Sequence, residues 1–151
     1  LRTRVRRDGR NATDRIIAAI EGSRFRKHPR LLLLQGIAVA GFNVVDIHAL
    51  NRHMGTPVLV VSRHEPDLVA VRAALLGSVP GGKRKWRLVE RAGPPMKAGA
   101  LWVQCAGCTC SWRIRLYSPS AVTPTATRSS TALIFSWRSG VRSGSITREP
   151  M

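Results

Sequence analysis

The stretch "LLLLQGIAVAGFNVVDI", residues 31–47, decides the fold, because it has the pattern of a buried strand, a glycine-hinged loop and the start of a helix. Gly36 and Gly41 mark the loop, and Gln35 stands where the strand meets it. In α/β proteins, ligands and catalytic groups collect at the carboxyl ends of parallel strands. An enzyme is therefore expected to place a carboxylate at this junction, and the neutral glutamine needs an explanation.

The segments on either side alternate between helix and strand patterns. The sequence predicts helices at 12–22, 43–54 and 65–77, and strands at 30–34, 56–62 and 100–107. The first helix opens on Asn11 with Asp14 three residues later, and the third has Pro66 in its first turn. "TPVLVVS" at 56–62 is continuously apolar, which is typical of a parallel strand covered on both faces. The alternation predicts an α/β fold with a mostly parallel sheet and crossover helices.

The character of the chain changes after Gly107. The chain has 151 residues, of which 44% are hydrophobic, so one domain with a core is expected. Beyond Gly107 the residues are rich in Ser, Thr and Arg, have no regular period, and include a single acidic residue, Glu149. We therefore expect residues 1–107 to form the α/β domain, and residues 108–151 to be an atypical, disordered tail.

The charge balance indicates an anionic partner. The chain has 25 Lys and Arg against 8 Asp and Glu, a net charge of +17, which favours nucleic acid. No apolar run approaches the roughly 20 residues of a membrane helix, and "LRTRVRRDGR" lacks the apolar part of a secretory signal. We expect a cytoplasmic protein that binds nucleic acid and no membrane, with its oligomeric state left open.

One basic segment and one cysteine cluster also stand out. "KRKWR" at 83–87 sets Trp86 among cations, which suits a phosphate backbone with a base stacked nearby; a basic hairpin edge that discourages aggregation is an equal alternative. "CAGCTC" holds Cys105, Cys108 and Cys110, one ligand short of a structural zinc site. The four histidines are scattered along the sequence, which is typical of solvated or packed side chains.

Metal-dependent cleavage of a phosphodiester needs two or more carboxylates that converge on a divalent cation. Asp14, Glu65 and Asp67 are predicted to serve helix starts, where negative charge is stabilised. Asp8, before Gly9, and Asp46, just past the glycine loop, are better candidates for a site, with a structural role as the alternative.

Several motifs resemble a known family. "DGRNATDRI", "SRF", "LLLLQGIAVAGFNVVDI", "GTPVLVVSRHEPD" and "RAGP" resemble the domain-of-unknown-function family ninety-nine, whose members look like endonuclease V and include the archaeal enzyme described as endonuclease dU. The resemblance covers about residues 5–107, and "AGFNVVD" is its most specific element. It implies a ribonuclease-H-like, endonuclease V-like fold and cleavage of nucleic acid at deaminated bases, assisted by Mg²⁺ or Mn²⁺.

The chain departs from this family pattern in three places. Family members open with a strand that carries an "IDD"-like motif, so we expect this chain to be truncated at its N-terminus and its fold to be incomplete. They usually have Asp where this chain has Gln35, whose carbonyl binds Mg²⁺ weakly because it lacks charge. The tail also differs, and a shift of reading frame before "TALIF" would explain it.

We therefore predict a nuclease-related protein whose catalysis is impaired or absent in this chain. The candidate catalytic residues are Asp8, Asp46 and Gln35, and the first two are also the candidate metal ligands. The candidate nucleic-acid contacts are Asn43, Lys83, Arg84, Lys85 and Trp86. The alternatives are a non-catalytic basic protein that binds nucleic acid, and a gene fragment without function.

Overall fold

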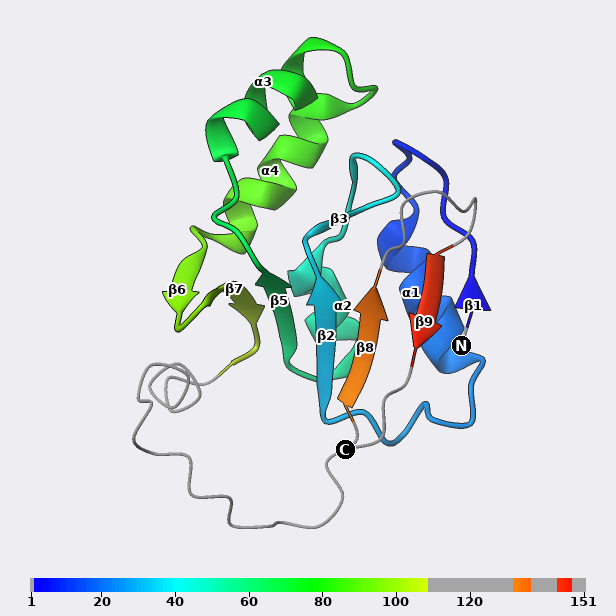
Figure 1. Cartoon of the computed structure of the whole chain (residues 1–151). Helices are drawn as coiled ribbons and strands as arrows, with labels where there is room; N and C mark the ends of the chain where they lie inside the picture. Colours follow the sequence, from blue (N-terminus) through cyan, green and yellow to red (C-terminus); the bar gives the residue numbers. More distant parts are fainter. Residues whose placement is uncertain (1, 109–131, 137–143, 148–151) are drawn as a thin grey trace.

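The computed structural model describes residues 2–108, 132–136 and 144–147, and its main element is a seven-stranded sheet (Figure 1). In sheet order the strands are β1 (Arg2–Thr3), β9 (Gly144–Thr147), β8 (Ala132–Ser136), β2 (Leu31–Gln35), β5 (Val58–Ser62), β7 (Leu101–Ala106) and β6 (Met96–Ala98). Strand β2 is parallel to β8 and β5, and every other pair among these strands is antiparallel. The α/β class is confirmed, but the prediction of a mostly parallel sheet is wrong.

The antiparallel part follows from a short connection. Strands β6 and β7 are joined by Gly99 and Ala100 alone, and Gly99 has a φ of 62°, in the left-handed region that glycine adopts readily. A two-residue connection joins only antiparallel strands, because a parallel crossover needs a dozen residues or more. The hairpin makes β6 and β7 antiparallel, and β7 is also antiparallel to β5, so this half of the sheet is antiparallel.

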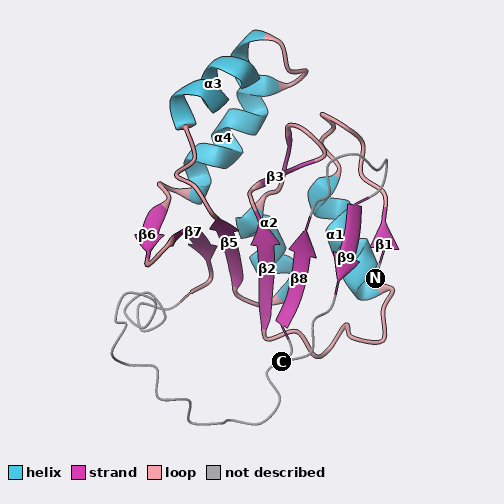
Figure 2. Cartoon of the chain, viewed as in Figure 1, coloured by secondary structure: helices cyan, strands magenta, loops and turns pink. Residues whose placement is uncertain are grey.

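Four helices accompany the sheet in the described part of the chain, as Figure 2 shows by colour. They are α1 (Ala12–Glu21), α2 (Ile47–Met54), α3 (Leu68–Gly77) and α4 (Gly82–Ala92). Helices α1 and α2 lie against one face of the sheet, and α3 with α4 forms a hairpin beyond the carboxyl ends of β2 and β5 (Figure 1). No helix within the described ranges has the length and apolar content needed to cross a membrane.

The three predicted helices are present; α1 begins at Ala12 as predicted, and the starts of α2 and α3 are corrected. Asn43 and Val44 belong to β4 (Asn43–Val44), which pairs with β3 (Ala38–Val39), so α2 begins only at Ile47. Helix α3 begins at Leu68, because the Asp67 side chain accepts a hydrogen bond from the Ala70 N–H and caps it. Pro66 therefore lies before the helix and not in its first turn.

The main core lies between the sheet and α1 and α2. Its buried members include Ile16 and Ile20 of α1, Leu32 and Leu34 of β2, Ile47 and Leu50 of α2, and Val58 and Val60 of β5. Alternate residues of a strand face opposite sides of a sheet, and Leu33, Leu59 and Val61 are only partly buried. Strand β5 is therefore buried on one face and only partly covered on the other, which corrects the expected cover on both faces.

A second core cluster joins the α3–α4 hairpin to β4. Its buried residues are Val44, Leu75 and Val89, and Trp86 packs against them. The "KRKWR" segment is therefore the first half of α4, and the alternative of a hairpin edge is wrong. Buried residues recur along α4 with helical spacing, at Gly82, Lys85, Val89 and Ala92.

The predicted disordered tail also needs a correction. Ala132–Ser136 form β8 beside β2, with Leu31 opposite Ala132, and Gly144–Thr147 form β9. The expectation of a tail without folded structure is therefore wrong for these two segments. Residues 109–131, 137–143 and 148–151 lie outside the described part of the chain, so the expectation stays a prediction there.

Candidate functional site

A groove lies at the carboxyl ends of the two adjacent parallel strands β2 and β5. Gln35 is opposite Val61 in the register of these strands, and the Gly36 N–H donates to the Val61 carbonyl at 3.0 Å. Gly36 has a φ of 83°, a conformation that suits glycine and turns the chain away directly after Gln35. The groove has a volume of about 600 Å³, within the usual range for ligand sites.

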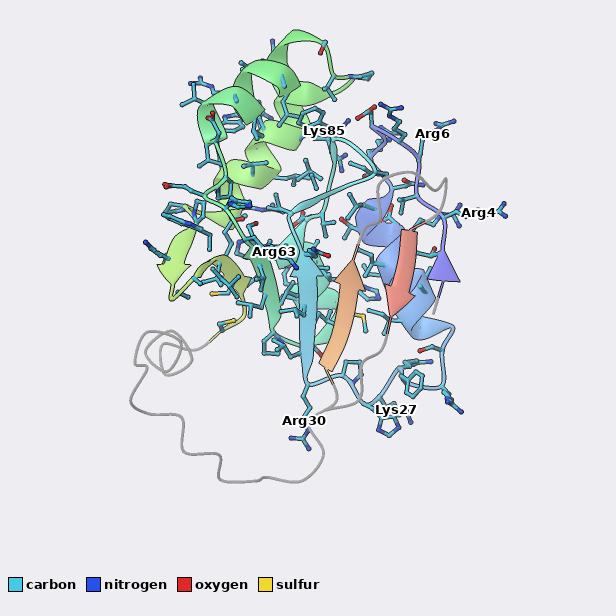
Figure 3. The ribbon with its side chains drawn as sticks, viewed as in Figure 1. Arg4, Arg6, Lys27, Arg30, Arg63 and Lys85 are labelled. Carbon is cyan, nitrogen blue, oxygen red and sulfur yellow. The ribbon has the colours of Figure 1, made fainter. Side chains whose placement is uncertain are left out.

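The groove combines an apolar wall with a few polar groups. Its apolar lining is Leu33, Leu34, Val61, Pro66 and Leu101. Its polar lining is Gln35, Ser62, Arg63, His64 and Glu65, of which all but Ser62 are exposed. Figure 3 places Arg63 at this end of the sheet. Such a composition is typical of sites that bind an organic ligand with one planar or apolar part and one polar part.

Sequence reasoning identified Gln35 at this position but missed most of the polar residues beside it. Arg63 and His64 received no role, and Glu65 was assigned to the start of a helix. The structure places Glu65 two residues before the cap of α3, in the connection that follows β5. Their position in the sequence could have identified them, because residues 63–65 come directly after a predicted strand, at the end where α/β proteins bind ligands.

Asp46 has a structural role at the start of α2. One carboxylate oxygen accepts a hydrogen bond from the Ala49 N–H at 2.9 Å, and the other accepts one from the Arg91 guanidinium. Burial by itself raises the pKa of Asp46, but the bond from Ala49 and the positive charges of Arg91 and Arg52 outweigh it and lower the pKa below its ordinary value. The Asp46 carboxylate is therefore already bound on both oxygens.

The charge on Asp46 predicts a pH-dependent effect on stability. Because its folded-state pKa is lowered, the stabilisation is complete above the unfolded pKa of about 4 and is lost as the pH falls through the folded value. Asp46→Asn keeps a good cap and removes only the charge, so we expect a loss of up to about 1 kcal/mol at pH 7 that disappears in acid. Asp46→Ala should lose about 1 kcal/mol more at every pH. Urea denaturation at several pH values measures both, and a constant Asp46→Asn loss would contradict the role of the charge.

Asp8 fastens the N-terminal segment to the glycine loop. It has a φ of 49°, its N–H donates to the Ala40 carbonyl, and its side chain accepts from the Phe42 N–H at 2.8 Å. Gly41 has a φ of 79°, and a Cβ there would lie 2.4 Å from the Asp8 carboxylate. The loop approaches Asp8 so closely that only glycine fits at this position. The second Asp8 oxygen lies 3.6 Å from Arg7.

Asn43 connects three segments from inside the protein. Its amide nitrogen donates to the Arg6 carbonyl and to the Asn11 side chain, each at 2.9 Å, and its oxygen accepts from the Ala12 N–H at 3.1 Å. The side chain is fully buried. It therefore holds the loop in place and does not contact a nucleic acid in this conformation. Asn11 makes no side-chain bond to the backbone of α1, which corrects its predicted capping role.

The basic residues at the start of α4 do not form one surface. Lys85 is 3% exposed, and its Nζ donates to the Asp8 carbonyl at 2.6 Å. Burial lowers the pKa of Lys85, although the nearby Asp8 charge opposes this effect. The Trp86 ring is half-buried, and its N–H donates to Glu90. Of the predicted contacts from this segment, only Lys83 and Arg84 are exposed.

The predicted metal ligands, Asp8 and Asp46, do not belong to a metal-binding cluster in the described part of the chain. Within the described ranges, no group of three or more His, Cys, Asp or Glu residues is arranged to hold a metal ion. The groove itself contributes one carboxylate, Glu65, one imidazole, His64, and the neutral amide of Gln35. The described site therefore suits an organic ligand better than a hard divalent cation, which favours several charged oxygen ligands.

Comparison with known proteins agrees with the sequence motifs. The model of the family described as endonuclease dU matches residues 1–128, which is most of the chain. The chain belongs to the endonuclease dU family. The resemblance predicted from "AGFNVVD" and the other motifs is thereby confirmed, and the family match extends past Gly107.

Relatives of this endonuclease dU family chain come from bacteria and archaea. A UPF0215 protein of Deinococcus radiodurans is 55% identical over 104 residues, which are 69% of this chain and 53% of that protein. A UPF0215 protein of Methanothermobacter thermautotrophicus is 42% identical over 71% of this chain and 54% of its own length. A crystal structure of a protein of unknown function from Archaeoglobus fulgidus matches with a TM-score of 0.69 and 34% identity, covering 74% of this chain and 64% of that one. The chain thus spans about half the length of these two curated relatives.

Proposed function

We propose that this chain acts on nucleic acid as a nuclease-related protein, with the groove at the ends of β2 and β5 as its site. The observation that supports this most is the position of the groove, at the carboxyl ends of two adjacent parallel strands in a chain of the endonuclease dU family. A net charge of +17 favours an anionic partner of this kind. We also infer a ribonuclease-H-like arrangement of the complete sheet, since β2 is parallel to both of its neighbours.

Dependence on Mg²⁺ or Mn²⁺ stays a prediction from the family resemblance. Asp46 is bound to Ala49 and Arg91, Asp8 is bound to Phe42, and Gln35 is neutral, so these residues do not fit a divalent cation as they stand. Catalysis by this chain is therefore expected to be weak. Gln35 is the one of the three that lies in the groove.

A nicking assay tests the proposed function. The full chain is incubated with DNA that contains deoxyuridine or deoxyinosine, with Mg²⁺, with Mn²⁺ or with EDTA. We expect slow nicking that needs the cation, and at least tenfold faster nicking by Gln35→Asp, because this change supplies the charge that the cation favours. The matched change is Gln35→Glu, which adds the same charge on a longer side chain. Absence of nicking by all three proteins would reject the nuclease function.

A second candidate function is binding of nucleic acid without cleavage, and the neutral Gln35 in the groove favours it. With this function, the chain would bind DNA with an affinity that falls steeply as the salt concentration rises, because each phosphate contact releases counterions. The slope of log K against log salt, measured by fluorescence anisotropy in EDTA, gives the number of such contacts. Binding that is insensitive to salt would contradict this function, and binding without any nicking would favour it over the nuclease.

A further inference from the structure

The walls of the groove suit a flat, apolar ligand group. Leu33 and Val61 lie on the sheet face opposite α1 and α2, because they alternate with the buried Leu34 and Val60. Leu101 lines the same groove and is 40% exposed, an unusual value for a leucine in a described strand. These side chains form an open apolar surface of the kind on which a nucleobase packs.

The Gln35 amide is positioned to bind such a group by its edge. It is exposed at the end of β2 and makes no hydrogen bond with another residue in the described part of the chain. An amide offers both a donor and an acceptor side by side, which is the combination that the edges of nucleobases require. A carboxylate at the same position would offer acceptors only.

Two charged residues of opposite sign, Arg63 and Glu65, lie at the rim of the groove. Arg63 is exposed, lines the groove and has no carboxylate partner among the described ion pairs. Glu65 lies further along the same connection, where it also lines a neighbouring groove formed with Pro94 and Pro95. A phosphate group at this rim would be attracted by Arg63 and repelled by Glu65.

We propose that the groove binds one nucleotide unit of a nucleic acid without a divalent cation. The base packs on the apolar wall, the Gln35 amide bonds to the base edge, and Arg63 binds the adjacent phosphate. This inference names the ligand class of the site in the proposed function and rests on it. It explains the neutral glutamine as a recognition group, since binding of this kind needs no charge at the end of β2.

Fluorescence anisotropy with a fluorescein-labelled single-stranded DNA, measured with the full chain in EDTA, tests the inference. Gln35→Leu keeps the size of the side chain and removes the amide, so affinity should fall about five- to tenfold. Arg63→Ala should weaken binding about tenfold and reduce the salt slope by about one. Glu65→Gln should tighten binding, because it removes the opposing charge. All three residues are exposed or at the rim, so circular dichroism should show unchanged folding.

Arg30→Ala is the matched control for lost charge. Arg30 is exposed at the other end of β2, as Figure 3 shows, so its loss should change affinity less than twofold. Thymidine monophosphate should compete with the DNA, whereas deoxyribose phosphate and inorganic phosphate should not. Equal effects of Arg63→Ala and Arg30→Ala, or an unchanged affinity of Gln35→Leu, would overturn the inference.

The two proposals fail in different ways. A protein that binds in EDTA through Gln35 and Arg63 but never nicks DNA refutes the nuclease function and retains the nucleotide site. A protein that nicks DNA while Gln35→Leu binds as tightly as the natural chain refutes the nucleotide site alone.

Discussion

Gly82→Ala should destabilise the protein by about 3 kcal/mol, because overpacking against backbone cannot be relieved by a side-chain movement. A Cβ on Gly82 would lie 1.6 Å from the carbonyl oxygen of Leu75, so α3 and α4 would have to separate. The hairpin would then lose its contact with the second core cluster, in which Leu75 is buried. Urea denaturation followed by circular dichroism measures the change.

Gly77→Ala is the control for this substitution. Gly77 also belongs to the α3–α4 hairpin, but a Cβ there meets nothing within 4 Å. Alanine should therefore be neutral or stabilise by up to about 1 kcal/mol, because it favours the helical backbone more than glycine does. Similar losses of stability for both variants would show that the close approach at Leu75 is not the cause.

Asn43→Ala should cost about 2–3 kcal/mol, because a buried polar group left without a partner costs about 1–3 kcal/mol. The change leaves the buried Ala12 N–H without its hydrogen bond and removes one of the two bonds to the Arg6 carbonyl, which still accepts from the Gly9 N–H. The N-terminal segment, the start of α1 and the glycine loop should loosen together. Hydrogen exchange at the Ala12 and Phe42 amides should become faster, as measured by NMR.

Asn43→Asp should be more harmful than Asn43→Ala at neutral pH. It would place a carboxylate against the Arg6 carbonyl and the Asn11 oxygen, which now accept hydrogen bonds from the amide. Burial and these acceptors would raise the pKa of the new group, so stability should return partly as the pH falls. Asn51→Ala is the milder comparison, because the Asn51 amide donates a single bond, to the Thr56 carbonyl. An equal loss for Asn51→Ala and Asn43→Ala would reject the connecting role of Asn43.

The predictable parts of the fold are those that depend on neighbours in sequence. Strand β2, the glycine turn and the end of α2 at Gly55 follow from apolar spacing and from residues that adopt special backbone angles. The position of Gln35 at the end of a parallel strand follows in the same way. Helix α4 was missed because Gly81, Gly82 and a run of cations resemble a turn, and Lys85 was taken for a surface residue.

Other features depend on contacts between distant residues. The contacts of Asp8 with Phe42 and of Asp46 with Arg91 join residues far apart in the chain, so no local pattern reveals them. The antiparallel pairing of β7 with β5 joins residues far apart in the chain, such as Leu59 and Cys105. Tertiary contacts, and not local preferences, decided each of these features.

The pairing of β8 with β2 also has a consequence for how the protein folds. Leu31 lies opposite Ala132, so the two partners are separated by about 100 residues of chain. Forming this pair closes a long loop, whose entropy must be overcome before the contact is stabilising, so the step should be slow. During synthesis, β2 has backbone N–H and C=O groups unpaired on that edge until residue 136 has emerged from the ribosome. Over this interval the central strand is open to pairing with other chains, and a chaperone that covers exposed strands would raise the yield of folded protein.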